Sequence, residues 1–242
     1  MERFEGLLRE GLEQYGLLEH CSPAAPQVLC RYGGMLLEKN QVMNLTAITD
    51  PVDVVRLHML DCAALLSVPG VELEGKRLLD VGTGAGFPGV VLKVLLPSLE
   101  VVLLDSLKKR LDWLEEVCGT LGLEGICVLH ARAEEQGHCA GFRDGFDVVT
   151  SRAVASLELL AELCLPFVKV GGVFLAMKSV ECDEEMSRAA QGIRRLGGAL
   201  RPVWEYVIPG TEVAHRVVIV EKIAPTPKGF PRRWAKIQKA PL

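Results

Sequence analysis

The sequence predicts an α/β protein with a doubly wound, mainly parallel sheet of seven strands and a helical N-terminal cap. From residue 76 onward, short apolar runs alternate with stretches of helical periodicity. A glycine-rich segment directly follows the first run, where a strand would give way to a helix. Strands that alternate with helices are typical of βαβ units, which build parallel sheets.

The cap is predicted over residues 1–68. A helix from Pro26 to about Asn40 is expected, and a later one has a clear start, with Asp50 as N-cap and Pro51 at the first helical position. Apolar residues at helical spacing mark the first and last helices: Phe4, Leu7, Leu8, Leu12 and Tyr15, then Val55, Met59, Cys62 and Leu66.

The sheet is predicted within residues 69–223, and a basic tail follows over residues 224–242. The last two strands are separated by the turn-like segment 209–212, so we expect them to pair antiparallel. The seven expected strands are Arg77–Val81, Val101–Asp105, Ile126–His130, Phe146–Thr150, Gly172–Lys178, Val203–Ile208 and Arg216–Lys222.

Composition excludes several classes of protein. No stretch reaches about 18 consecutive apolar residues, so no membrane span is expected, and the acidic N-terminus does not resemble a secretory signal. The eight cysteines are never closer than nine residues, so they offer no Cys-x-x-Cys metal site. We expect a cytoplasmic protein with reduced cysteines and no bound metal.

The charge is uneven along the chain. From Lys222 to the end there are six Lys or Arg and no acidic residue, so the rest of the chain carries −10 against a net charge of −4. A basic tail on an acidic body is typical either of an anionic partner or of a solvated extension. Phe230 and Trp234 lie among the cations, where they would suit base stacking or would pin the tail to the body, and we expect a mixed role.

The segment from Leu78 to Gly89 predicts a cofactor loop. Gly82, Gly84, Gly86 and Gly89 follow the first strand and open a helix, where glycine lets the backbone turn tightly and approach a ligand. Asp105, which ends the next strand, would bind a ribose. The glycine spacing also fits a dinucleotide. Asp80 favours S-adenosylmethionine, because a carboxylate beside the loop would repel a pyrophosphate but not a sulfonium and an ammonium.

Other polar residues follow strands whose carboxyl ends should meet at one edge of the sheet. Open α/β sheets bind their ligands at that edge. The residues are Ala133-Glu134 after the third strand, Ser151-Arg152-Ala153 after the fourth and Lys178 at the end of the fifth.

The ordered motifs resemble those of the bacterial rRNA guanine-N7 methyltransferases called RsmG, or glucose-inhibited division protein B. The resemblance covers nearly the whole chain. Its motifs are Asn44–Ile48, His58-x-x-Asp61, Leu79–Gly89, Leu104–Leu107 with Lys109-Arg110, Arg132–Glu134, Ser151–Ala155, Met177-Lys178 and Pro231–Arg233 with a terminal Pro-Leu.

The resemblance implies a class I, Rossmann-like methyltransferase fold. It implies that S-adenosylmethionine methylates N7 of one guanine in a conserved loop of 16S rRNA, in the small ribosomal subunit. Carried over by position, Gly82 and Phe87 would line the donor pocket, with Asp105, Ser106 and Leu107 at the ribose and adenine. Ala133 and Glu134 would lie near the adenine, and Arg152 beside the donor on the substrate side.

Guanine N7 carries a free lone pair, so we nominate no catalytic base and expect catalysis by positioning. Arg152, Asp61 and His58 are candidates for stabilising the charge on the methylated base. The expected RNA contacts are Asn44, His58, Lys178, Arg232, Arg233 and Lys236.

Two other functions remain open on the residues. One is a NAD(P)-dependent oxidoreductase on the same fold, which Asp80 and the lack of an obvious catalytic pair argue against. The other is a non-catalytic RNA-binding protein, which the intact glycines and Asp105 argue against. We expect a monomer.

Overall fold

The computed structural model describes residues 2–152 and 154–242, so Ala153 of the motif after the fourth strand lies outside the described residues. The N-terminal cap consists of α1 (Glu2–Gln14), α2 (Ala25–Met43) and a continuous helix from Pro51 to Ser67. That last helix passes from α3 (Pro51–Asp53) through the π-helical η1 (Val54–Leu60) and α4 (Asp61–Ala63) to η2 (Ala64–Ser67). Asp50 caps it as predicted, because its carboxylate accepts hydrogen bonds from the backbone N–H groups of Val52 and Asp53.

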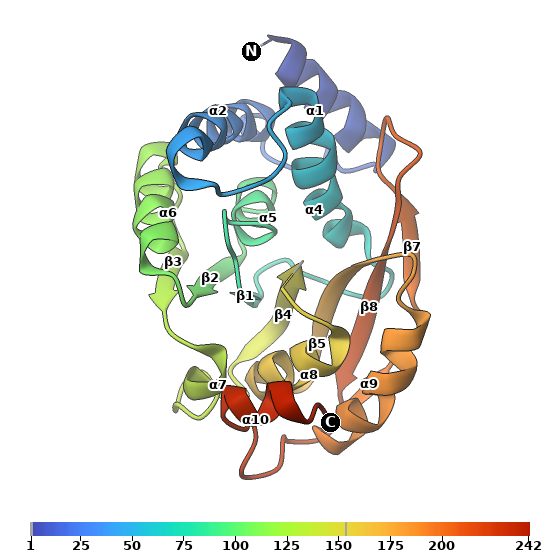
Figure 1. Cartoon of the computed structure of the whole chain (residues 1–242). Coiled ribbons are helices and arrows are strands. Elements are labelled where there is room, and N and C mark those ends of the chain that lie inside the picture. The colour runs from blue at the N-terminus through green and yellow to red at the C-terminus, as the bar shows by residue number, and fades with distance from the viewer. Residues whose placement is uncertain (1, 153) are drawn as a thin grey trace.

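The sheet alternates with helices along the chain, as the sequence predicts (Figure 1). Its strand order is β3-β2-β1-β4-β5-β8-β6. The five strands β1 to β5 are parallel, and β8 runs antiparallel to β5. The strands are β1 (Arg77–Val81), β2 (Glu100–Asp105), β3 (Ile126–His130), β4 (Phe146–Arg152), β5 (Val168–Ser179), β6 (Gly198–Leu200), β7 (Trp204–Val207) and β8 (Ala214–Lys222).

All seven predicted strands are present, and the three-residue β6 is additional. β6 pairs with the carboxyl-terminal half of β8 and β7 with its amino-terminal half, both antiparallel. The two strands therefore share one position at the edge of the sheet. The break between them contains Pro202, which has no N–H group to donate to a neighbouring strand.

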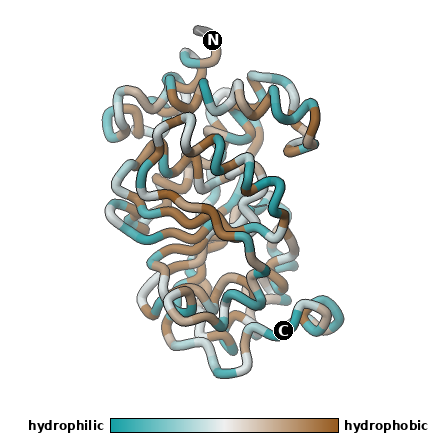
Figure 2. Tube along the Cα trace, turned by 90° about the vertical axis from the view of Figure 1, so that its left-hand side faces the viewer, coloured by the Kyte–Doolittle hydropathy of each residue, from teal (hydrophilic) through white to brown (hydrophobic). Residues whose placement is uncertain are grey.

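Helices cover both faces of the sheet, and each face has its own core. On one face, the cap packs together with α5 (Gly89–Leu95) and α6 (Lys108–Leu121) against alternate residues of the strands, such as Leu78, Leu103 and Leu175. On the other face lie α8 (Leu157–Cys164), the 3₁₀ turn η3 (Leu165–Phe167), α9 (Asp183–Arg195) and α10 (Trp234–Lys239). The strands between these layers are the most hydrophobic stretches of the chain (Figure 2). The cap therefore shares a core with the sheet.

The C-terminal segment folds back onto the second layer (Figure 1). Ile237 of α10 is fully buried, and Arg143 donates hydrogen bonds to the backbone oxygens of Thr226, Pro227 and Phe230. The short helix α7 (Ala133–Gln136) follows β3, and His138 behind it contacts the backbone oxygen of Pro231 at 2.8 Å. The tail is thus attached to the body of the protein, which agrees with one of the two interpretations that the sequence left open.

Within residues 2–152 and 154–242, no helix is long and apolar enough to cross a membrane.

Candidate functional site: a cavity at the carboxyl ends of the strands

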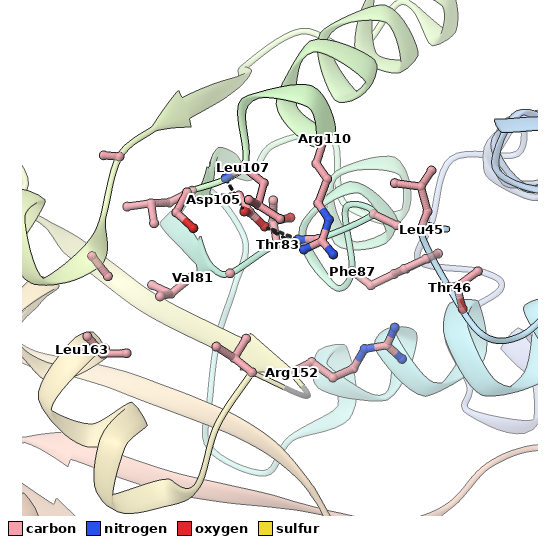
Figure 3. A pocket seen from close by; sticks show the side chains of 18 of the residues that line it. Leu45, Thr46, Val81, Thr83, Phe87, Asp105, Leu107, Arg110, Arg152 and Leu163 are labelled. Carbon is pink, nitrogen blue, oxygen red and sulfur yellow. Dashed lines mark hydrogen bonds and ion pairs between the residues drawn. The ribbon is translucent and has the colours of Figure 1, made fainter. Parts of the chain in front are cut away.

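A cavity of about 510 Å³ opens where the parallel strands end (Figure 3). The strand order reverses between β1 and β4, and open α/β sheets bind ligands at such a point. The walls come from the ends of β1, β2 and β4, from α8 and from the cap. The lining residues are Leu45, Thr46, His58, Val81, Gly82, Thr83, Gly84, Ala85, Phe87, Leu104, Asp105, Ser106, Leu107, Arg110, Ala131, Ala133, Arg152, Val154 and Leu163.

The glycine loop after β1 forms the floor of this cavity. Gly84 has a φ of +59°, which disfavours any other residue, and a Cβ added there would meet nothing closer than Gly82 O at 3.9 Å. A side chain at this position would therefore enter the open cavity. Tyr32 of α2 donates a hydrogen bond to Ala85 O, so the cap fixes the loop from behind.

Asp105 at the end of β2 lines the cavity and also holds the loop. One carboxylate oxygen accepts a hydrogen bond from Gly84 N at 3.0 Å, and the other accepts one from Leu107 N at 2.8 Å. Arg110 Nη1 lies 3.7 Å from the carboxylate. The neighbouring Leu107 is 51% exposed at the cavity, where its apolar surface suits a flat apolar ring.

Asp80 does not face the cavity, which corrects its assignment as a direct ligand residue. Its side chain is fully buried behind the loop and accepts hydrogen bonds from Thr83 Oγ1 at 2.7 Å and Gly89 N at 3.0 Å. Burial raises the pKa of this carboxyl group to about 6. Asp80 still affects the choice of cofactor, because it accepts the hydrogen bond of Gly89 N, the first N–H group of α5. In a dinucleotide-binding fold, that helix terminus would bind a pyrophosphate.

Two other expected cofactor residues also lie outside the cavity. Gly86 faces inward, where an added Cβ would clash with Val90, Leu114 and Tyr32, so this glycine serves close packing. Glu134 turns away from the cavity toward a second groove, although Ala133 before it lines the cavity. The remaining candidates, Gly82, Gly84, Phe87, Asp105, Ser106, Leu107, Ala133 and Arg152, all line the cavity.

Arg152 at the end of β4 is the centre of a hydrogen-bonded network. Its guanidinium donates to Asp61 Oδ2 at 3.1 Å, to Leu57 O at 3.1 Å and to His58 Nδ1 at 2.8 Å. Asp61 is 1% exposed, and its other oxygen contacts Tyr206 Oη and His215 Nδ1, each at 2.7 Å. Burial alone would raise the pKa of Asp61, but the hydrogen bond from His215 and the charge of Arg152 outweigh it and lower that pKa.

Only two of the three candidate catalytic residues therefore reach the cavity. Arg152 and His58 line the cavity, whereas Asp61 lies behind them and does not. Asp61 positions Arg152 and balances its charge, so it cannot touch a base in the cavity. His58 stacks on Phe87 with ring centroids 4.6 Å apart, and its Nε2 lies 2.7 Å from Thr46 Oγ1. Burial and then the charge of Arg152 lower the pKa of His58 to about 4.

Lys178 is not available for RNA, which corrects its assignment. Its ammonium group donates to Ala155 O at 2.8 Å and to the Glu185 carboxylate at 2.7 Å. The same carboxylate oxygen accepts a hydrogen bond from Leu157 N, so Glu185 ties α9 both to the end of β5 and to the start of α8. Asn44 is exposed at the C-cap of α2, with a φ of +49°, directly before the cavity-lining residues Leu45 and Thr46.

The candidate RNA-binding residues of the basic tail also differ in whether they are free to contact RNA. Arg232 is not a free cation, because its side chain and its backbone N–H all donate to the carboxylate of Glu162, which is fully buried. Arg233 and Lys236 are exposed and line a groove between α7 and α10, together with Arg132 and Trp234. Arg233 and Lys236 thus remain candidates for RNA contact, whereas Arg232 is structural.

A family model described as rRNA small subunit methyltransferase G matches residues 26–201. A relative of that name from Symbiobacterium thermophilum is 46% identical over 99% of this chain and 98% of its own length. Another from Alkaliphilus oremlandii is 42% identical over 98% of both chains. The chain belongs to this family.

The fold agrees with that membership. TrmN from Thermus thermophilus is similar over 67% of this chain and 48% of its own length, with a TM-score of 0.52 and 24% identity. A SAM-dependent O-methyltransferase from Thermotoga maritima is similar over 80% of this chain and 73% of its own, with a TM-score of 0.52 and 16% identity. The predicted methyltransferase fold and the predicted family are therefore confirmed.

Some residues of this family member's site were not predicted. Thr46 and Arg110 lie within the family motifs Asn44–Ile48 and Lys109-Arg110, yet the motifs do not reveal that both line the cavity. Tyr206 and His215 join the network from β7 and β8, about 150 residues away from Asp61 along the chain. No local pattern signals such contacts, because only the sheet topology brings β8 beside the start of α4.

Proposed function

We propose that this protein transfers a methyl group from S-adenosylmethionine to N7 of a guanine in the 16S rRNA of the small ribosomal subunit. The observation that carries the proposal is full-length similarity to proteins named rRNA small subunit methyltransferase G, combined with an intact cavity over the glycine loop. We further propose that the enzyme acts as a cytoplasmic monomer.

The cavity fits S-adenosylmethionine on three observations. Its volume of about 510 Å³ is in the usual range for a small-molecule site. Gly84 leaves open space above the loop, and the exposed Leu107 offers an apolar surface for adenine. Asp105 presents a carboxylate for the ribose hydroxyls, and Ser106 and Ala133 complete the adenine side in this proposal.

NAD(P) fits less well, so we do not propose an oxidoreductase. Gly89 N donates to Asp80, and Val90 N donates to Gly86 O. The first two N–H groups of α5 are thus already paired, which leaves fewer donors for a pyrophosphate at this helix terminus.

The bound donor would supply a methyl group activated by a cationic sulfonium. The lone pair of guanine N7 can accept that methyl group without losing a proton, so the protein needs no general base. The task left to its residues is to hold the base in line and exclude water. Arg152, locked by Asp61 and His58, and Phe87, stacked on His58, form a rigid wall for this purpose.

We propose that RNA contacts the cavity mouth and the groove between α7 and α10. His58 lines the cavity and the exposed Asn44 directly precedes the lining residues Leu45 and Thr46, whereas Arg233 and Lys236 would contact phosphates along the groove. Trp234 in the same groove could stack on an unpaired base.

Calorimetric titration tests the cofactor proposal. We expect S-adenosylmethionine and S-adenosylhomocysteine to bind at one site and NAD to show little affinity. Binding of NAD without S-adenosylmethionine would overturn the assignment of the cavity.

A further inference from the structure

The cap contributes Leu45 and Thr46 to the cavity, on the side away from Leu163 (Figure 3). The backbone of Thr46 is fixed by Asn40 of α2. Asn40 Nδ2 donates to Thr46 O, and Asn40 Oδ1 accepts from Thr46 N, both at 2.9 Å. Thr46 is therefore held at the wall as firmly as the helix that carries Asn40.

The hydrogen bonds of His58 fix the direction in which the Thr46 hydroxyl points. A guanidinium can only donate, so His58 Nδ1 must accept the hydrogen bond from Arg152 at 2.8 Å. The neutral imidazole then carries its proton on Nε2 and donates it to Thr46 Oγ1 at 2.7 Å.

Thr46 Oγ1 also accepts a hydrogen bond from Ile48 N at 3.0 Å. Both of its acceptor positions are thus used, and its own hydrogen remains. In the part of the chain that the structure describes, no hydrogen bond uses this hydrogen as a donor, and Thr46 lines the cavity. The network consequently presents one neutral hydrogen-bond donor to whatever enters from this side.

We propose that Thr46 Oγ1 donates its hydrogen to O6 of the target guanine and thereby selects guanine over adenine. This inference rests on the proposed function. Beside N7, guanine carries the acceptor O6, whereas adenine carries an amino group that donates. A donor fixed at this point pairs with guanine but meets another donor when adenine enters.

A neutral hydroxyl suits this task better than a cation. The base becomes positively charged when N7 is methylated, and a second positive charge nearby would oppose the reaction. Arg152 lies close by, but Asp61 balances its charge and its hydrogen bonds are directed to Asp61, Leu57 and His58. His58 itself stays neutral near pH 7, because its pKa is lowered to about 4.

The test is a cycle that removes each hydrogen-bonding partner in turn. Small subunits are reconstituted from 16S rRNA in which a ligated synthetic segment carries either guanine or 2-aminopurine at the methylated position. 2-Aminopurine keeps N7 but lacks O6. The kcat/KM for methyl transfer is measured for the wild type, for Thr46→Val, which keeps the shape, and for Thr46→Ser, which keeps the hydroxyl.

We expect the wild type to prefer guanine over 2-aminopurine by a factor roughly three- to tenfold larger than the factor shown by Thr46→Val, as for one net hydrogen bond. Thr46→Ser, which keeps the hydroxyl, should restore the wild-type ratio between guanine and 2-aminopurine. Because the cycle compares ratios, differences in the reactivity of N7 cancel.

Equal ratios for the wild type and Thr46→Val would overturn the role of Thr46 while leaving the proposed function intact. No methyl transfer to guanine by the wild type would overturn both. A nitrogen-15 NMR spectrum gives an independent check, because a His58 tautomer with its proton on Nδ1 would also overturn the inference.

Discussion

Arg232 and Arg233 are neighbours with opposite roles, and replacing each in turn tests how the tail is built. Arg232 donates three side-chain hydrogen bonds, from Nε and Nη2, and one backbone hydrogen bond to Glu162, whose side chain is 0% exposed. Arg233 stands at the N-cap of α10, is exposed and lines the groove beside α7. Arg232→Ala should therefore lower the free energy of unfolding, whereas Arg233→Ala should leave it nearly unchanged.

The size of the effect follows from Glu162. Removing Arg232 leaves a buried carboxylate without its charged partner, which costs about 3–5 kcal/mol in comparable pairs. Because the Arg232 side chain is itself 15% exposed, we expect the lower end of that range, about 3 kcal/mol. For a chain of this size, that corresponds to a fall in Tm of roughly 6–12 °C. Arg233→Ala should change the free energy of unfolding by no more than about 0.5 kcal/mol.

Thermal and urea unfolding of the two single variants measures these changes. Adding Glu162→Gln to Arg232→Ala should recover part of the loss, since the unpaired charge is then gone. RNA binding should show the converse pattern. Arg233→Ala should flatten the log–log salt dependence by up to about 0.7, as for one contact to a single strand, and Arg232→Ala should leave the slope unchanged. Equal melting temperatures for the two variants would refute this division of roles.

We make three further predictions for residues that line the cavity or are buried behind it. Asp105→Ala should weaken S-adenosylmethionine binding by about 1.5–3 kcal/mol in calorimetry, and Gly84→Val should abolish binding by filling the cavity; unchanged affinity in both would refute the site. The folded-state pKa of Asp80, about 6, lies above its ordinary 3.8, so its contribution to stability is lost as pH rises from about 4 through about 6. Asp80→Asn should remove on the order of 2–3 kcal/mol of that pH dependence in urea unfolding, and an unaltered profile would contradict the burial argument. The pKa of His58 is lowered from 6.5 to about 4, so the stability that the neutral imidazole contributes is lost as pH falls from 6.5 through about 4. NMR should find the imidazole neutral at pH 6, and an imidazolium there would contradict the network.

The sequence predicts most of the sheet because its signals are local. β1 and β3 have the bounds that their apolar runs predict, and the loop after β1 is recognisable from its glycines alone. β6 was missed because three residues, Gly198–Leu200, are too few for a pattern. β5 begins at Val168, earlier than predicted, because Val168 already pairs with Phe146 of β4 before a shift in register. The pair Gly171-Gly172 made this part of the strand look like a turn in the sequence.

The sequence predicts a site residue correctly only where its position at the end of a strand is enough to place it in the cavity. Gly84 and Asp105 follow strand ends, and both reach the cavity. Asp80 also stands near a strand end, but the side of the sheet that its side chain faces is decided by the pleat and by Gly89 packing against it. Lys178 and Arg232 were misassigned because their carboxylate partners, Glu185 and Glu162, come from other elements and cannot be read from the sequence near them.

The central claim concerns the modified nucleoside, and one measurement tests it most directly. Small subunits lacking the modification are incubated with the purified protein and methyl-labelled S-adenosylmethionine, and the 16S rRNA nucleosides are analysed by mass spectrometry. A Gly84→Val variant, which we expect not to bind the donor, serves as the control. We predict that the label appears in 7-methylguanosine at one site and only with the wild-type protein. Label in another nucleoside, or no label in the rRNA at all, would contradict the account.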